Sequence, residues 1–144
     1  MNIFFDCDYT LIAWDGRLRP GVRELFKALT DDGHTLYVWS GVGIRWYEVR
    51  KHGLERYVTD CFHKPISDFK RRMVAAGLSP WPDLVIDDYP EIVSTLGGVR
   101  VKPYVYERQT DREMYKLYHV ISALCANGSR PDAIEEPCCC TDDA

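Results

Sequence analysis

The segment NIFFDCDYTLI, residues 2–12, decides the fold that we expect for this sequence. Its apolar run ends in two aspartates, Asp6 and Asp8, which one residue separates. A short, continuous apolar run is typical of a strand buried on both faces, so it predicts a strand over residues 3–6. This strand brings two like charges to one point. Two carboxylates about 4 Å apart repel each other by roughly 4 kcal/mol at an effective dielectric constant of about 20, so the pair requires a cation.

Beyond this segment, short apolar runs alternate with amphipathic stretches along the chain. The alternation predicts a three-layer α/β fold, a doubly wound parallel sheet with helices on both faces. We expect further strands at residues 35–41, 61–63, 83–87 and 99–103, the last at an edge of the sheet. We expect helices at residues 20–30, 46–53, 68–77, 90–97 and 111–126. Ser67 is the expected N-cap of the third helix.

The length of 144 residues fits one domain with its own core. Hydrophobic residues make up 46% of the chain and charged residues 28%, a composition that excludes wholesale disorder. We assign residues 1–126 to the folded domain. Residues 127–144 lack periodicity and are rich in acid, proline and cysteine, so we expect a flexible C-terminal tail there.

The charge balance and the apolar runs argue against two classes of partner. The net charge of -4 argues against a protein that wraps nucleic acid, because such a protein needs a basic surface. No stretch approaches the roughly 18 apolar residues of a membrane span, and no basic segment precedes a long apolar one at the N-terminus. The six cysteines follow no scaffold spacing, so we expect reduced thiols and a cytoplasmic protein.

Polar residues that can react lie where the expected strands end. In doubly wound sheets the carboxyl ends of the strands line the ligand crevice, which is deepest where the strand order reverses. Four separate segments therefore converge on one edge of the predicted sheet. They contribute Asp6 and Asp8 after the first strand, Ser40 after the second, Lys64 after the third, and Asp87 with Asp88 after the fourth.

These residue types combine ligands for a cation with donors for an anion. The acids offer only hard oxygen ligands, and the metal that fits them is magnesium, which keeps several waters and accepts one or two carboxylates plus a phosphate oxygen. The Ser40 hydroxyl and the backbone amides that follow it, beginning with Gly41, can donate to a phosphoryl oxygen. The Lys64 ammonium balances its charge. Together they indicate phosphoryl-transfer chemistry.

The four segments resemble the motifs of the haloacid dehalogenase-like (HAD) phosphatase superfamily. They read FFDCDYTL, LYVWSG, HKP and VIDD, and they occur in the family's order over residues 2–103. A single DxD is not specific, but four motifs in order at strand ends are. The resemblance implies a HAD-like Rossmannoid fold and a metal-binding hydrolase.

The resemblance also implies a role for each acid. Asp6 attacks phosphorus and becomes an aspartyl-phosphate, and Asp8 protonates the leaving oxygen and later activates water. Asp6, the backbone carbonyl of Asp8, and Asp88 hold Mg²⁺, with Asp87 in support. Thr10 steadies the loop that presents the acids. Family dehalogenases and ion-pumping ATPases lack an acid at the position of Asp8, so its presence favours phosphatase or phosphomutase chemistry.

HAD enzymes that act on small metabolites carry a sizeable inserted cap domain, and this chain has no room for one. The gap between the first and second motifs holds a short loop and one helix, and the gap between the third and fourth holds one helix and a turn. We therefore expect no large cap domain and an open site. Other capless members act on phosphoproteins, nucleic-acid ends or carrier-bound groups, or close their sites by oligomerising. By this analogy we expect either a macromolecular phosphorylated substrate or a site closed by a second copy of the chain; the net charge does not indicate a nucleic-acid end.

The acids have structural alternatives. Asp6 and Asp8 are also compatible with solvated acids in a turn. Asp87 and Asp88 also fit as caps of the helix that begins at Pro90.

The other site residues have alternatives too. Ser40 is also compatible with a cap at the strand end, and Lys70 and Lys102 compete with Lys64 for the same role. Cys7 is expected to pack rather than react, because its acidic setting raises the pKa of a thiol. Four residues flank the expected mouth of the crevice, where they either pack or grip a leaving group: Trp14, Arg17, Arg45 and Trp46.

Two functions remain open from the sequence. The first is a magnesium-dependent phosphatase that hydrolyses phosphate monoesters through an aspartyl-phosphate on Asp6. The second is a HAD-fold binding or regulatory protein that keeps the motifs and turns over poorly. A receiver-type phosphoacceptor domain is set aside, because its acceptor aspartate would follow the third strand and its lysine the fifth.

Overall fold

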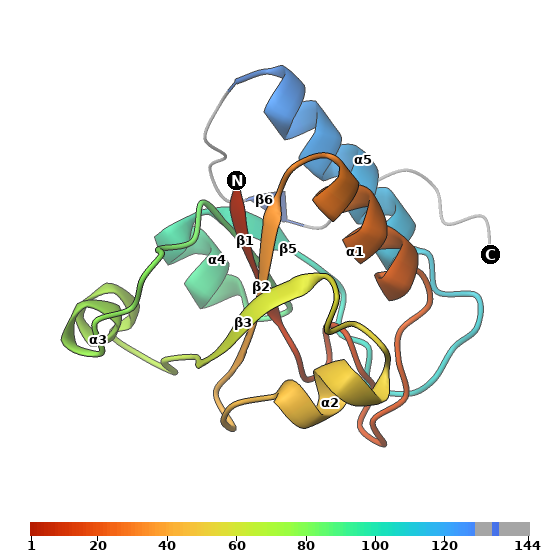
Figure 1. Ribbon diagram of the computed structural model, residues 1–144, viewed down its shortest axis with the longest axis horizontal. Coiled ribbons are helices and arrows are strands. Elements are labelled where there is room, and N and C mark those ends of the chain that lie inside the picture. Colours follow the sequence, from red (N-terminus) through yellow and green to blue (C-terminus); the bar gives the residue numbers. More distant parts are fainter. Residues whose placement is uncertain (129–133, 136–144) are drawn as a thin grey trace.

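The structure, a computed structural model, describes residues 1–128 and 134–135. Its described part is an α/β fold around a six-stranded sheet in which every pairing is parallel (Figure 1). The strand order is β3-β2-β1-β4-β5-β6. The strands are β1 (Asn2–Asp6), β2 (Thr35–Ser40), β3 (Val58–His63), β4 (Leu84–Asp87), β5 (Gly98–Arg100) and β6 (Ile134–Glu135).

The centre of the sheet consists of β1 and β4. All four residues of β4 are buried, and so are the last four of β1. The chain runs outward from β1 to β2 and β3, then returns to place β4 on the other side of β1. The strand order therefore reverses between β1 and β4, and a crevice for a ligand is expected at their carboxyl ends.

Helices cover both faces of the sheet, which makes three layers (Figure 1). The helices are α1 (Val22–Asp31), α2 (Trp46–Lys51), α3 (Phe69–Ala75), α4 (Pro90–Leu96) and α5 (Glu113–Ala126). One hydrophobic core joins residues of α1, α2 and α5 to one face of the sheet, and a second joins residues of α3 and α4 to the other. Successive side chains of a strand point to opposite faces, so Ile3 and Phe5 enter the first core and Phe4 the second.

The predicted α/β class, with a parallel sheet between two helical layers, is confirmed. The helix and strand boundaries differ by a few residues from those expected. The connection from β1 to β2 contains a loop and α1, and the connection from β3 to β4 contains α3 and a turn. Both connections lie wholly within the described residues, and neither contains a further domain.

Two local predictions are wrong. The strand expected at residues 99–103 is not at an edge, because β5 pairs with β4 on one side and with β6 on the other. Ser67 is not the N-cap of α3; that position belongs to Asp68, which has a φ of 50° and makes no side-chain cap hydrogen bond. A left-handed backbone at this position replaces the extended conformation that a capping side chain needs.

The expected flexible tail lies largely outside the described residues. Of the residues expected to form it, 129–133 and 136–144 lie outside the described part of the chain. Between these two ranges, β6 pairs in parallel with β5, and Ile134 lies opposite Val99.

No described helix has the length and apolar character needed to cross a bilayer.

Candidate functional site

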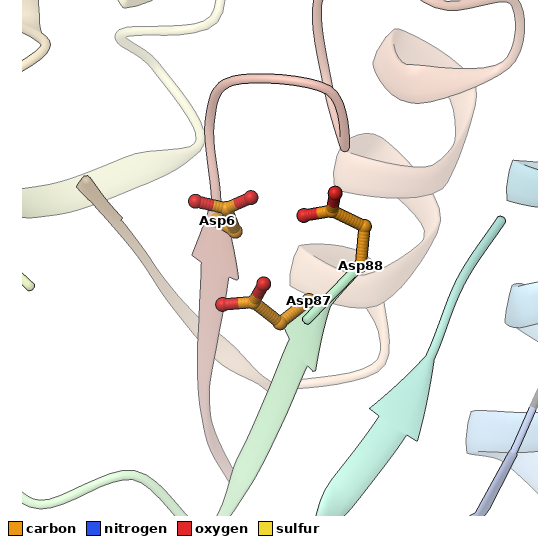
Figure 2. A group of neighbouring side chains, drawn as sticks. All are labelled: Asp6, Asp87 and Asp88. Atoms are coloured by element: carbon orange, nitrogen blue, oxygen red, sulfur yellow. The ribbon is translucent and has the colours of Figure 1, made fainter. Parts of the chain in front are cut away.

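Three aspartates meet at the carboxyl ends of β1 and β4 (Figure 2). One carboxylate oxygen from each of Asp6, Asp87 and Asp88 lies within 4.8 Å of those of the other two. The register explains the meeting. Phe5 pairs with Ile86, so the residues that follow them, Asp6 and Asp87, end neighbouring strands side by side. The cluster therefore lies where the strand order reverses.

Lys64 links two of these carboxylates. Its Nζ donates to Asp6 Oδ1 and to Asp87 Oδ2, each at 2.9 Å. The residue follows β3, and its backbone N–H donates to the carbonyl of Ser40 at 2.9 Å, which carries the β2–β3 ladder one step past the end of β3. Lys64 is the lysine that the sequence favoured over Lys70 and Lys102 for this position.

The cluster is strongly acidic, and one ammonium group serves two buried carboxylates. Burial and then the charge of Asp87 raise the pKa of Asp6 well above its usual value, while Lys64 acts in the opposite direction. Burial raises the pKa of Asp87 to about 6, again against the effect of Lys64. Burial by itself would lower the pKa of Lys64, but the charges of Asp6 and Asp87 outweigh burial and raise it. A further cation would relieve this repulsion.

Thr10 joins the acid of β1 to the acid that follows β4. Its hydroxyl donates to Asp6 Oδ2 at 3.1 Å and lies 3.5 Å from Asp88 Oδ1. The side chain is fully buried, and the loop around it is tightly turned, since Tyr9 has a φ of 64°. A left-handed backbone costs free energy at a residue other than glycine, and such strain is often found at functional sites. These contacts suit the steadying role that the sequence gave to Thr10.

The Asp8 carboxylate lies apart from the three-carboxylate cluster. Its Oδ2 accepts a hydrogen bond from Ser40 Oγ at 3.0 Å, and its Oδ1 accepts one from Arg45 Nη2 at 2.6 Å. The two acids of the opening segment are therefore balanced by different cations, Asp6 by Lys64 and Asp8 by Arg45.

Ser40 makes the cap at the strand end that the sequence offered as its alternative role. Its hydroxyl donates to Asp8 and also accepts the backbone N–H of Val42 at 3.1 Å, which is a turn at the end of β2. The next residue, Gly41, lies close to Ile66: a Cβ added to Gly41 would be 2.9 Å from the Ile66 Cγ2. A side chain at this position would displace Ile66, so glycine permits the close approach of the two loops.

Asp87 and Asp88 do not cap α4 in the usual way. The N-cap residue is Tyr89, and it makes no side-chain cap hydrogen bond. Asp87 Oδ1 accepts the backbone N–H of Tyr89 at 2.9 Å, so this carboxylate has a partner for each oxygen. Asp88 is partly exposed and its hydrogen bond to Thr10 is long. Asp88 is thus the freer of the two acids to bind an ion.

One residue that supports the site was missed from the sequence. Arg19 is 1% exposed, and its Nε and Nη2 donate to the two carboxylate oxygens of Asp111 at 2.8 and 3.0 Å. Its Nη1 donates to the carbonyl of Thr10 at 3.2 Å. A buried ion pair therefore fastens the loop after β1 to the loop before α5. The two partners are 92 residues apart, and no local pattern connects them.

Of the four residues expected at the mouth, all of which the structure describes, Arg45 is the one that contacts a proposed catalytic acid, Asp8. Trp14 is 65% exposed, and its backbone N–H donates to the carbonyl of Val105. Arg17 pairs with Glu107. The Trp46 ring lies beneath the guanidinium of Arg50, which is 5.2 Å from the ring centroid.

Cys7, which separates the two acids of the first motif, is a buried thiol. It is 2% exposed, and burial raises its pKa to about 12, as it does for Cys61. Because the thiolate is the reactive form, we expect iodoacetamide at about pH 8 to modify the exposed Cys125 while sparing Cys7 and Cys61. Peptide mass spectrometry measures the modification, and labelling in guanidinium provides the control in which all three react. Rapid modification of Cys7 in the native protein would show that this thiol is not inert.

Comparison with known proteins does not place this chain in a family. No protein-family model matches it, and no curated protein is significantly similar to it. One solved crystal structure superimposes with a TM-score of 0.45 at 15% sequence identity, over 94% of this chain and 88% of that one. Neither a family nor an activity follows from a similarity at this level.

Proposed function

We propose that the protein is a HAD-like, magnesium-dependent phosphatase that hydrolyses phosphate monoesters through an aspartyl-phosphate on Asp6. The observation that carries this proposal is the cluster of Asp6, Asp87 and Asp88 at the point where the strand order reverses, with Lys64 bound to two of its members. Three carboxylates brought together at the edge of a sheet repel one another, and a bound cation would offset this repulsion.

The donor set of the cluster fits Mg²⁺. Carboxylate oxygens are hard ligands, and Mg²⁺ needs only one or two of them, together with waters and a phosphate oxygen. We assign Asp6, the backbone carbonyl of Asp8, and Asp88 as the ligands, with Asp87 holding Lys64 in place. When bound, the ion supplies positive charge beside the transferring phosphoryl group.

The proposed reaction has two steps. In the first, an oxygen of Asp6 attacks phosphorus in line with the ester oxygen, which leaves with a proton from Asp8. In the second, Asp8 takes a proton from a water molecule, which attacks phosphorus and releases inorganic phosphate and the carboxylate of Asp6. Lys64, Ser40 and the backbone N–H of Gly41 would hold the phosphoryl oxygens. Thr10 and Lys64 fix the orientation of the Asp6 carboxylate.

The separation of Asp8 from the carboxylate cluster supports this division of roles. Asp6 belongs to the group that would hold metal, whereas Asp8 is held by Ser40 and Arg45 beside the proposed phosphate cradle. The open connections around the site further favour a phosphorylated macromolecule as substrate. The cytoplasmic setting without a membrane partner is part of the proposal and comes from the cysteine spacing and the apolar runs of the sequence.

One observation favours the second candidate, a HAD-fold binding or regulatory protein with weak turnover. Arg45 Nη2 lies 2.6 Å from Asp8 Oδ1, so the proposed acid is engaged in an ion pair. If Arg45 does not release this oxygen when a substrate binds, proton transfer from Asp8 is impeded. Such a protein would bind Mg²⁺ and phosphate without hydrolysing esters.

The test is hydrolysis of 4-nitrophenyl phosphate with magnesium and after its removal by EDTA. We expect turnover that depends on Mg²⁺ and returns when the ion is restored, because the acidic cluster needs a cation before an anionic phosphate can approach. A thermal-melting scan in the same buffers reports ion binding independently of turnover. Melting that responds to Mg²⁺ without hydrolysis would favour the binding protein, and hydrolysis unaffected by EDTA would contradict the metal site.

A further inference from the structure

A hollow of about 330 Å³ lies beside the proposed phosphate cradle, at the carboxyl ends of β2 and β3 and against α3. Its volume is at the lower end of the range for small-molecule sites, enough for a single ring with a substituent. It is lined by residues of the two strand ends, the following loop and the helix, including Gly41, His63, Ile66, Arg72, Met73 and Leu78.

The position of the hollow connects it with the proposed site on two neighbouring strands. Gly41 directly follows Ser40, whose hydroxyl holds Asp8. His63 directly precedes Lys64, whose ammonium holds Asp6. After β2 the hollow includes Gly41, which we assign to phosphate binding, and at β3 it begins one residue before Lys64, which we also assign to it. A group attached to a phosphate in the cradle would therefore meet the hollow next.

The lining of the hollow has an apolar floor. Met73 is 1% exposed and Leu78 is half-buried, and Ile66 closes over Gly41. A thioether makes favourable contacts with the edge of an aromatic ring. The floor thus suits a flat apolar group better than a hydroxyl-rich one such as a sugar, whose polar groups would be left without partners.

The rim of the hollow carries a cation that is not paired within the described residues. Arg72 is exposed and forms no ion pair there, whereas its neighbour Arg71 lies 3.6 Å from Asp68. His63 is exposed on the same rim. A guanidinium above an apolar floor selects a ring with an acidic substituent, because the ring fills the hollow while the acid reaches the donors.

We infer that this hollow receives the leaving group of the substrate, and that the leaving group is an aromatic ring bearing an acidic group. The inference rests on the proposed phosphatase function and names the substrate class of the same site. The ring can belong to a small aryl phosphate or to a phosphotyrosine beside an acidic residue, since both offer the same chemistry.

Kinetics with three esters test the inference: 4-carboxyphenyl, phenyl and ethyl phosphate. Ala76 lines the hollow and is exposed, so Ala76→Trp fills it without touching the acids. We expect Ala76→Trp to lower kcat/KM for both aryl esters at least about tenfold and to leave ethyl phosphate within about twofold. The matched control is Ala75→Trp, because Ala75 is exposed on the same helix and is not among the residues lining the hollow. Equal losses for all three esters would overturn the inference.

The charge on the rim is tested separately. We expect Arg72→Gln to lower kcat/KM about tenfold for 4-carboxyphenyl phosphate but not for phenyl phosphate. Arg71→Gln removes a neighbouring charge from the same helix and should change neither. An acidic phosphotyrosyl peptide, included as a fourth substrate, distinguishes a ring carried by a protein from one carried by a small molecule. If Arg72→Gln changes kcat/KM by the same factor for the two aryl esters, Arg72 does not recognise the acidic substituent and this part of the inference is wrong.

Binding without turnover separates this inference from the proposed function. In protein labelled with ¹³C at the methionine methyls, 4-hydroxybenzoate should shift the signal of Met73 but not those of Met1 and Met114, which pack in the core on the other side of the sheet. Ala76→Trp should abolish the shift. Phosphatase activity that depends on Asp6 with no shift of Met73 would refute the inference alone. A shift of Met73 in a protein without activity would refute the proposed function and leave the hollow as a site for aryl acids.

Discussion

Replacement of Asp6 by asparagine is expected to reduce the magnesium-dependent hydrolysis of phosphate monoesters at least about a thousandfold, because the amide is not a nucleophile. The fold should survive the change. An asparagine oxygen can still accept the hydrogen bond from Lys64 or Thr10, and the loss of a buried negative charge removes its repulsion with Asp87. We therefore expect a melting temperature at least as high as that of the wild type in metal-free buffer.

Steady-state kinetics and thermal melting on the same samples check both parts of this prediction. The matched control is Asp15→Asn, which removes an exposed acid of the same loop that pairs only with Arg17 in the described structure and should leave turnover unchanged. If Asp6→Asn keeps a tenth or more of the wild-type activity, Asp6 is not the nucleophile.

Replacement of Lys64 by methionine is expected to lower the free energy of unfolding by about 3–5 kcal/mol without metal, because it leaves two buried carboxylates unpaired. Asp6 is 4% exposed and Asp87 is fully buried, so water cannot replace the lost ammonium. Mg²⁺ should restore part of the lost stability, since it supplies the positive charge that the lysine no longer provides. Denaturant unfolding in EDTA and in Mg²⁺ measures the effect.

The free energy of unfolding that Lys64→Met loses should depend on pH, and the pKa of Asp87 gives the sign of this dependence. The pKa of Asp87 is raised to about 6 in the native state, so native protein binds this proton more tightly than unfolded protein does. The stability that this tighter proton binding contributes is fully present below the pKa of Asp87 in the unfolded chain, about 4. It is lost as the pH rises through about 6. The defect of Lys64→Met should therefore be larger at neutral than at acidic pH. Lys70→Met, on the exposed side of α3, should change stability by less than about 0.5 kcal/mol, and a similar loss in both variants would contradict the buried pairing.

The parts of the site that sequence reasoning placed correctly depend on strand ends. The apolar runs before Asp6 and Asp87 predict buried strands, and parallel strands align their carboxyl ends, so these acids and Lys64 were expected at one edge. The register of β1 and β4 then brings the carboxylates together. No detail of side-chain conformation is needed for this result.

The direction of each side chain could not be predicted in the same way. Asp6 ends β1 and Asp8 lies two residues later in the loop, yet they face different cations, because Arg45 approaches Asp8 from the start of α2. The backbone of the loop and the distant Arg45 jointly fix this choice. The pair of Arg19 and Asp111 is likewise a contact between remote segments, without a periodicity that would reveal it.

The predictions for the short elements failed for a different reason. β6 has only two residues, too few for an alternation of apolar and polar positions to appear in the sequence. At α3, the serine that favours a cap lies one residue before the actual N-cap, where Asp68 adopts a left-handed backbone. Local propensities of this kind are weak, and tertiary packing overrides them.

The buried pair of Arg19 and Asp111 also determines when the site can be completed during protein synthesis. Asp111 follows Arg19 by 92 residues, so it leaves the ribosome long after the first strand and its acidic loop. Until Asp111 is synthesised, the Arg19 guanidinium lacks the carboxylate that pairs with it in the folded protein, and burying it unpaired costs several kcal/mol. The nascent chain is thus expected to keep the loop after β1 unanchored, so the proposed binding of metal and phosphate would become possible only once most of the domain has been translated.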